Sequence, residues 1–282
     1  MTPEPEVAEK QTKRVSVVIV SLNRVELLRR SLARLGEGHQ VIVVDNGSID
    51  GSAVAGDAFP GVRSMRLPKN FGSTKALNVG LRTADNEYIL LLHDDTLISG
   101  EAVGRLADFL ESHPEVGAVC PFLTDSAGHA VPQMRLLPTP AVTDPPLQVP
   151  SEHVTEAEIK AECVSGAAIM IRSFFVRALR QIDERYGDYG PSIEICAQMR
   201  RAGKKIVILR DVTAVHEASP SPVPDTMLAG DRVAGSAVFL AKHYGFVSSL
   251  VYRLKTALGA LFTFRFSMLA AALSGQKIDG TV

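Results

Sequence analysis

The sequence predicts an α/β fold with a Rossmann-like, mostly parallel central sheet flanked by helices, and three observations support this prediction. Short apolar runs rich in β-branched residues alternate with segments of helical periodicity, as in repeated strand–helix–strand units. Clusters of polar and turn-forming residues follow these runs, where parallel strands would end. A length of 282 residues with 46% hydrophobic residues is sufficient for a large packed core.

The first half of the chain supplies the repeating units in order. The expected strands are VSVVIV (15–20), VIVV (41–44), SMRL (64–67) and YILLL (88–92), and the expected helices are SLNRVELLRRSLARL (21–35) and NFGSTKALNVGL (70–81). Asn23 and Glu26 have the spacing of a capping box, which predicts the start of the first helix there. Right-handed crossovers would then bring all the strand ends to one edge of the sheet.

The segment LLLHDDT (90–96) is the strongest candidate for a site. Its apolar run stops at His93, Asp94 and Asp95, at the edge where ligands of parallel sheets collect. Carboxylates are hard oxygen ligands that suit Mg2+ or Mn2+. Taken alone, the segment is more typical of a strand that ends in a solvated acidic turn than of a metal site. The polar loops that precede it in the chain and share its edge favour the metal site.

The turn cluster DNGSIDGS (45–52) follows the second expected strand. Asp45 is placed to accept a hydrogen bond from a nucleobase or a ribose, as an acid at this position does in dinucleotide-binding folds. A purely local role, in which Asp45 caps the turn through Asn46 and Gly47, fits the residue equally well. The GxGxxG turn of dinucleotide dehydrogenases is missing after the first strand, which argues against that class.

Charge, cysteines and the chain start exclude several protein classes. A formal net charge of −1 gives no basic surface for nucleic acid. Cys120, Cys163 and Cys196 lie far apart in sequence and suggest neither a disulfide framework nor a zinc site. Residues 1–14 lack the apolar core of a secretion signal, so we expect a disordered tail and a cytoplasmic protein.

The segment TALGALFTFRFSMLAAAL (256–273) is apolar except for Arg265 and a few hydroxyl groups. A charge in the middle of an eighteen-residue run argues against a helix that spans a membrane. Two interpretations stay open: a helix pair that is buried or faces a partner, and an anchor in the membrane interface.

Four segments, in this order and spacing, resemble the nucleotide-sugar half of the inverting family 2 glycosyltransferases with a GT-A fold: VSVVIVSLNR, VVDNGSIDGS, NFGSTKALNVGL and YILLLHDDT. The resemblance implies a nucleobase and ribose site at Ser21, Asp45 and Asn46, a diphosphate site near Asn70 and Lys75, Asp94 close to the sugar or ribose, and Asp95 as ligand of Mg2+ or Mn2+. His93 replaces the Asp or Asn that often begins this motif.

The second half of the chain continues the resemblance more loosely. CVSGAAIMIR (163–172) resembles the family's SGA-containing strand on the acceptor side, and His216 matches a histidine that in relatives reaches the metal or the diphosphate, although a lone histidine is also commonly structural. We therefore expect a tail at 1–14, a nucleotide-sugar half at 15–121, an acceptor half at 122–225 and a helical extension at 226–282. The Pro-rich segment 138–150 is expected to be a loop, either a lid or disordered.

The expected catalytic base is where the chain departs from the family. Relatives carry an acidic pair just before a helix, and the segment IEICAQMRRAG places Pro191 and Ser192 at those positions. Neither side chain can take a proton at neutral pH without help. Asp188 and Glu194 are the nearest carboxylates and the candidate bases. Either also fits a different role, as a negative charge near a helix N-terminus.

The resemblance thus implies a transferase that moves a sugar from a UDP- or dTDP-sugar to a hydroxyl acceptor with inversion. A rhamnosyltransferase-like branch would act on cell-surface polysaccharide or lipid-linked glycans, at the inner face of a membrane, with the helical extension contacting either that membrane or a second copy. The alternative is a catalytically impaired protein that binds nucleotide and acts as a partner or regulator. A nucleotidyltransferase is weaker, because its Gly-rich basic loop is absent.

Overall fold

The computed structural model describes residues 14–150, 156–187 and 189–275. The predicted tail up to residue 13 lies outside this range, as does Asp188. Its strands are β1 (Val15–Ser21), β2 (Gln40–Asp45), β3 (Val62–Arg66), β4 (Tyr88–His93), β5 (Thr96–Leu97), β6 (Val116–Thr124), β7 (Met134–Arg135), β8 (Glu158–Ala161), β9 (Cys163–Val164), β10 (Ala168–Arg172) and β11 (Lys205–His216).

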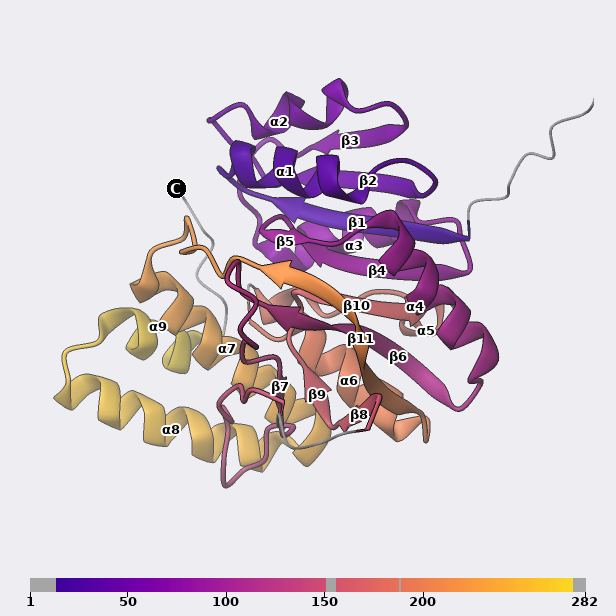
Figure 1. Cartoon of the computed structure of the whole chain (residues 1–282). Coiled ribbons are helices and arrows are strands. Elements are labelled where there is room, and N and C mark those ends of the chain that lie inside the picture. Colours follow the sequence, from indigo (N-terminus) through magenta and orange to yellow (C-terminus); the bar gives the residue numbers. More distant parts are fainter. Residues whose placement is uncertain (1–13, 151–155, 188, 276–282) are drawn as a thin grey trace, which may run out of the picture.

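The helices alternate with these strands as the sequence predicts. They are α1 (Val25–Leu35), α2 (Ser52–Ala55), α3 (Ser73–Thr83), α4 (Gly100–Ser112), α5 (Ser173–Leu179), α6 (Pro191–Arg201), α7 (Asp225–Tyr244), α8 (Phe246–Phe262) and α9 (Phe266–Ser274), with the 3-10 helices η1 (Gly56–Ala58) and η2 (Glu184–Tyr186). The predicted α/β class with a helical extension is therefore confirmed (Figure 1).

The central sheet has the strand order β3-β2-β1-β4-β10-β6-β11-β5, and β8 pairs with β11. The strands β3, β2, β1 and β4 are parallel, whereas β10 runs antiparallel to both β4 and β6. Val20 pairs with His93 and Ser21 pairs with Asp45, so β1, β2 and β4 end at the same level. This register places the polar loops after these strands at one edge.

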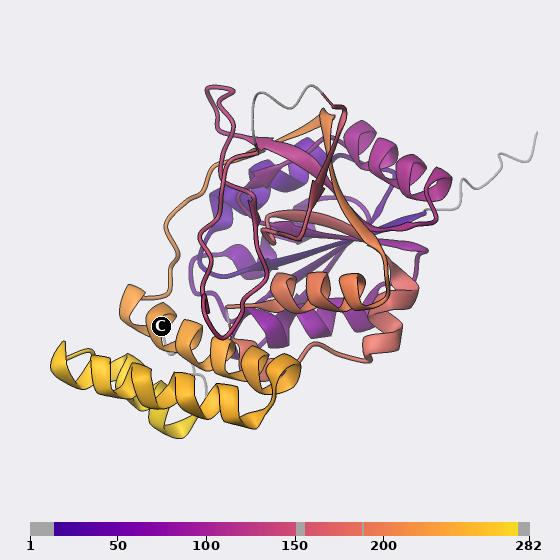
Figure 2. The same cartoon turned by 90° about the horizontal axis from the view of Figure 1, so that it is seen from below.

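Helices cover both faces of the sheet, and the pleat sorts the apolar side chains between them. Along β1, Val17 and Ile19 join one buried cluster with residues of α1 and α4, whereas Val18 joins the other with residues of α3 and α6. Figures 1 and 2 show the two helical layers with the sheet between them. The near-continuous apolar runs seen in the sequence follow from burial on both faces.

The predicted capping box at the start of α1 is wrong. Asn23 has a left-handed backbone with φ of 49°, and its side-chain oxygen accepts a hydrogen bond from the backbone of Ile49. The backbone N–H of Val25, in the first turn of α1, instead donates a hydrogen bond to Asp50 of the DNGSIDGS turn. Asp50, 25 residues further along the chain, thus takes the place of the predicted local cap.

The C-terminal helices form a unit beside the sheet. Helix α7 packs against η2, α8 and α9, and α8 and α9 pack against each other (Figure 1). Within the described residues, no helix is both long and apolar enough to cross a membrane.

A buried ionic network joins α6 to α7. The Glu194 carboxylate accepts hydrogen bonds from Tyr186, Gln198, Lys242 and His243 at 2.5–2.8 Å. Burial opposes ionisation of Glu194, but these four hydrogen bonds outweigh it and lower its pKa to about 2. The carboxylate therefore stays charged in the folded protein and holds the two helices together.

We expect Gly80→Ala to destabilise the protein, because α3 lies directly on the sheet there. A Cβ on Gly80 would lie 2.4 Å from Cγ1 of Val18 and 3.2 Å from Cγ2 of Val44. Overpacking of this kind lowers the free energy of unfolding by about 1–3 kcal/mol. Gly104→Ala on α4 is the matched control, since nothing lies within 4 Å, and it should stabilise by about 0.5–1 kcal/mol. Urea unfolding measures both variants, and equal effects would contradict this packing.

Glu194→Gln should destabilise the protein in a pH-dependent way. The pKa of Glu194 is lowered from the usual 4.5 to about 2 on folding, so its charge stabilises the folded state above about pH 5 and ceases to do so as the pH falls towards 2. We expect a loss of about 2–4 kcal/mol in the free energy of unfolding near pH 7. Urea unfolding should show the loss shrinking by more than half between pH 6 and pH 3. A loss that is independent of pH would contradict this role, and Glu101→Gln, an exposed glutamate, is the control.

Candidate functional site

A pocket of about 410 Å³ opens at the edge of the sheet where β1 and β4 end. It is lined by Val20, Ser21, Leu22, Arg24, Asn46, Ser73, His93, Asp94, Asp95, His216, Ala218, Ser219, Ser221, Pro222, Val223 and Leu228. Five of the predicted site residues are therefore brought to one cavity: Ser21, Asn46, Asp94, Asp95 and His216. The HDD segment, the residues after β1 and the end of β11 supply most of its polar groups.

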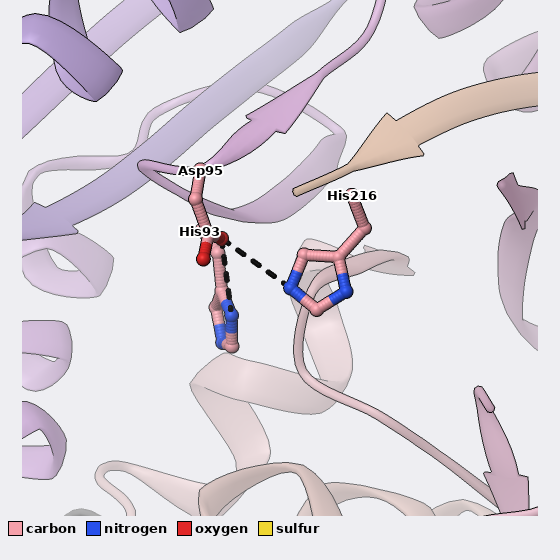
Figure 3. A group of neighbouring side chains, drawn as sticks. All are labelled: His93, Asp95 and His216. Carbon is pink, nitrogen blue, oxygen red and sulfur yellow. Dashed lines mark ion pairs between the residues drawn. The ribbon is translucent and has the colours of Figure 1, made fainter. Parts of the chain in front are cut away.

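His93, Asp95 and His216 converge on a point where a metal ion could bind (Figure 3). One ligand atom of each residue lies within 4.8 Å of those of the other two. Asp95 Oδ1 is 3.3 Å from His216 Nε2 and 4.0 Å from His93 Nδ1. The sequence predicted Asp95 and His216 as ligands; His93, noted only as a replacement within the motif, completes the group.

The pairing of short strand β5 with β11 brings His216 to Asp95. His216 lies opposite Thr96 in this antiparallel pair, directly beside the HDD turn. The backbone of Glu217 also donates a hydrogen bond to the backbone oxygen of Asp95 at 3.0 Å. Residues separated by more than one hundred positions are thereby fixed at contact distance.

The Asp95 carboxylate is suited to a divalent cation. It is 2% exposed, and none of the described residues donates a well-aligned hydrogen bond to Oδ1. Burial opposes its ionisation, but the contacts with His216 and with other positive groups outweigh it and lower the pKa to about 2. A buried, ionised oxygen with spare acceptor capacity next to two imidazoles fits Mn2+ or Mg2+.

Arg24 is a further candidate site residue, which the sequence motifs did not predict. Its Nη1 lies 3.2 Å from Asp94 Oδ1 and 3.3 Å from Asp95 Oδ2, and Nη2 donates to the backbone oxygens of Ser219 and Pro220. The guanidinium therefore joins both acids to the loop after β11. The signal in the sequence was the SLNR end of the first segment, where an arginine directly follows the Asn23 turn.

Asp94 faces the end of β1. Its Oδ2 accepts a hydrogen bond from the hydroxyl of Ser21 at 2.8 Å. Burial raises the pKa of Asp94, and Arg24 and Ser21 counteract this only in part. The two neighbouring acids thus have different electrostatic roles, with Asp95 firmly ionised and Asp94 easier to protonate.

A second group extends from Asn46 of the pocket lining to Asp45 and Asn70. Asn46 donates from Nδ2 to Oδ1 of Asn70 at 2.8 Å, and Asp45 accepts from the backbone of Ser48. Nδ2 of Asn70 is buried and has no acceptor among the described residues, which leaves it available to an oxygen of a ligand. Lys75 lies further out, with Nζ 4.6 Å from the centre of the Phe71 ring.

The start of α6 reaches the site at Ser192. The predicted single strand 163–172 is interrupted between β9 and β10, and the backbone of His93 donates to Ala167 in this gap. A Cβ on Gly166 would lie 3.2 Å from His93 Nε2 and 3.7 Å from Ser192 Cβ. The helix therefore presents Ser192 beside the HDD segment, where relatives are expected to carry an acid.

The two candidate bases are placed differently. Glu194 is held by its four donors at the contact between α6 and α7, and it is not among the described residues that line the pocket. Asp188 lies outside the described residues. The structure thus brings the metal and nucleotide candidates together but leaves Glu194 in a packing role.

The sequence model of glycosyl transferase family 2 matches residues 16–177, which include β1 to β10 and the HDD segment. Two curated relatives match shorter stretches. The undecaprenyl-phosphate 4-deoxy-4-formamido-L-arabinose transferase of Pectobacterium carotovorum is 31% identical over 120 residues, covering 38% of this chain and 37% of that protein. The poly-beta-1,6-N-acetyl-D-glucosamine synthase of Staphylococcus epidermidis is 26% identical over 117 residues, covering 39% and 28%. The chain thus matches 37% of the length of the first relative and 28% of the length of the second.

Two solved structures share the fold. The mannosyltransferase PcManGT from Pyrobaculum calidifontis, in complex with GDP-Man and Mn2+, has a TM-score of 0.56 and 18% identity, with 95% of this chain and 76% of that chain covered. TarS 1-349 from S. aureus, in complex with UDP-GlcNAc, has a TM-score of 0.56 and 16% identity, with 93% and 92% covered. They confirm the GT-A fold, and together with the match over residues 16–177 they lead to one assignment: the chain belongs to glycosyl transferase family 2.

Proposed function

We propose that this protein transfers a sugar from a nucleoside diphosphate, UDP or dTDP, to a hydroxyl acceptor with inversion at the anomeric carbon. The buried Asp95 carboxylate between His93 and His216, at the floor of a pocket in a family 2 fold, is the observation that carries this proposal. The nucleotide-sugar complexes of the two structural neighbours support a donor of the same chemical class.

The donor would lie across the ends of β1, β2 and β4. In this arrangement Asp45 and Asn46 contact the base and ribose, and the unpaired Nδ2 of Asn70 donates to an oxygen of the nucleotide. Ser21 holds Asp94 through its hydroxyl, which fixes that acid close to the sugar or ribose. Lys75, partly exposed, supplies positive charge near the diphosphate.

Asp95 and His216 would hold the cation, with His93 completing the ligand set. When bound there, Mg2+ or Mn2+ neutralises the charge that develops on the departing diphosphate. Arg24 already touches both acids with its guanidinium group. It keeps Asp94 and Asp95 in place before the donor arrives.

Inversion requires one carboxylate to take the proton of the attacking hydroxyl. We propose Asp188 for this role from its position in the chain, three residues before α6 begins at Pro191. Glu194 is the weaker candidate because a carboxylate with a pKa of about 2 and four hydrogen bonds is a poor proton acceptor. Ser192, beside His93, then contacts the acceptor rather than accepting its proton.

The acceptor we propose is a glycan or a lipid-linked sugar of cell-surface polysaccharide or glycolipid synthesis. The curated relatives support this class, because one is an undecaprenyl-phosphate sugar transferase and the other a poly-beta-1,6-N-acetyl-D-glucosamine synthase. The transfer would take place on the cytoplasmic side of a membrane.

A second candidate is favoured by the start of α6, where Pro191 and Ser192 stand at the family's acidic positions. In that case the protein binds nucleotide and metal without turnover and acts as a partner or regulator. The two candidates share the pocket and differ only in whether a proton acceptor is present.

We expect UDP or dTDP to raise the melting temperature of the protein in the presence of Mn2+, since ligands that bind the native state stabilise it. Asp95→Asn should abolish the Mn2+-dependent part of this rise while leaving the melting temperature in EDTA within a few degrees of wild type. Asp211→Asn, which changes an exposed acid paired with Arg105, is the matched control and should behave as wild type. Failure of every nucleoside diphosphate to stabilise the wild type would refute the donor assignment.

Turnover separates the two candidate functions. If the enzyme reading of the pocket is right, hydrolysis or transfer of a UDP- or dTDP-sugar should be measurable and should fall at least ~100-fold in Asp95→Asn. Asp188→Asn should reduce turnover to a similar extent while nucleotide binding is retained. Nucleotide binding by the wild type without any turnover of these donors would establish the non-catalytic candidate instead.

Arg24→Ala should destabilise the metal-free protein, because it leaves two buried acids without their shared cation. Breaking a buried ion pair in this way costs about 3 kcal/mol or more. Mn2+ should raise the melting temperature of this variant more than that of wild type, since the ion replaces the lost positive charge. Arg29→Ala, which removes an exposed arginine of α1, is the control. Equal melting temperatures of Arg24→Ala and wild type in EDTA would show that Arg24 does not hold the acids.

A further inference from the structure

Helix α8 turns its large apolar side chains outward. Leu254, Leu258, Leu261 and Phe262 are all exposed, and their spacing of three or four residues places them along one face of the helix. On the inward face, against α7 and α9, Ser249 and Ala260 are buried, and among the described residues Tyr252 is the one large apolar side chain of α8 that packs into the small cluster there. A helix that packs on a protein core shows the opposite arrangement.

The turn after α8 continues this apolar face. Phe264 and Phe266 are 78% and 70% exposed and stand on either side of Arg265. Phe264 has a left-handed backbone with φ of 55°, a conformation that is uncommon for an aromatic residue. In Figures 1 and 2, α8 and this turn form the outer border of the molecule, away from the central sheet. The protein thus holds a continuous apolar edge open to its surroundings.

The formal charges of α8, the turn 263–265 and α9 all have one sign. From residue 246 to residue 274 the chain contains Arg253, Lys255 and Arg265 and no Asp or Glu. Lys255 and Arg265 are exposed among the apolar side chains. This contrasts with the net charge of −1 of the whole chain. An apolar surface edged only by positive charge is complementary to anionic lipid.

A second copy of the chain suits this surface less well. A twofold interface brings the same patch of both copies together, so Lys255 and Arg265 of one copy would face a patch whose formal charges are also all basic. Like charges held within an apolar contact oppose association. An anionic bilayer removes this conflict, because its headgroups pair with the basic side chains while its acyl chains receive the apolar ones.

We propose that α8, the turn 263–265 and the start of α9 dock on the surface of an anionic phospholipid membrane. Within the described residues no helix is able to cross the bilayer, so the contact is interfacial. Helix α7, which packs on α8 and α9, also carries Leu228 of the pocket lining. Docking would therefore bring the pocket close to the membrane surface, where a lipid-linked acceptor is held.

Fluorescence offers a direct test because the chain contains no tryptophan. Phe264→Trp introduces a single emitter at the edge, and its emission should shift to the blue on addition of vesicles of phosphatidylcholine with phosphatidylglycerol. Phe174→Trp is the matched control, since Phe174 is 53% exposed on α5, outside the C-terminal helices. Equal behaviour of the two emitters, or no shift at Phe264→Trp, would overturn the proposal.

Cosedimentation with vesicles tests the charge and the apolar face separately. Full-length protein should sediment with phosphatidylglycerol vesicles and much less with phosphatidylcholine alone. Lys255→Gln with Arg265→Gln should weaken binding roughly 25-fold, at about fivefold for each basic residue. Leu258→Asp should abolish it, whereas Phe174→Asp should not, with circular dichroism confirming that each variant is folded.

A second copy as the true occupant would give a different result. The wild type would then form a dimer in sedimentation velocity, Leu258→Asp would convert it to a monomer, and no vesicle binding would be seen, which would overturn the membrane proposal. These measurements need neither nucleotide nor metal. Loss of nucleotide binding would therefore refute the proposed function without affecting the membrane contact, and the reverse also holds.

Discussion

The contact of Asp95 with His216 is the interaction on which the site depends. Asp95 follows β4 in the parallel part of the sheet, and His216 ends β11 on the other side of the antiparallel strand β10. Neither residue forms a site alone. The short strand β5 turns the chain back from the HDD segment to pair with β11, and this pairing makes two distant sequence positions into neighbouring candidate ligands.

Positive charge near the acids comes from the chain itself. Arg24 contacts Asp94 and Asp95 and also binds backbone oxygens of the loop after β11. The same side chain therefore balances the charge of the acids and ties that loop to the pocket. A buried pair of acids would otherwise repel, and one of them would take up a proton. Electrostatics and loop position are thus coupled at this point of the structure.

On the acceptor side, the position of α6 depends on its contact with α7. Helix α6 has its N-terminus at the site and its first turn fixed to α7 by the carboxylate of Glu194. This network orients the helix that presents Ser192 beside His93. The C-terminal helices, which carry the outward apolar face, continue directly from α7. The site therefore connects to the proposed membrane face through direct contacts: α6 begins at the site, Glu194 joins α6 to α7, and α7 packs on α8 and α9.

The sequence by itself determined the alternation of strands and helices, the end of β4 at His93, and the assembly of polar loops at one edge, because these depend on local hydrophobic patterns and on the register of parallel strands. It also indicated Asp95 and His216. Tertiary structure alone decided the role of Arg24, the replacement of the Asn23 cap by Asp50, and the burial of Glu194. The partners of Arg24 and Val25, and the donors Lys242 and His243 of Glu194, lie more than twenty residues away in the chain. No local pattern records these contacts, and their energy arises only once the chain has folded.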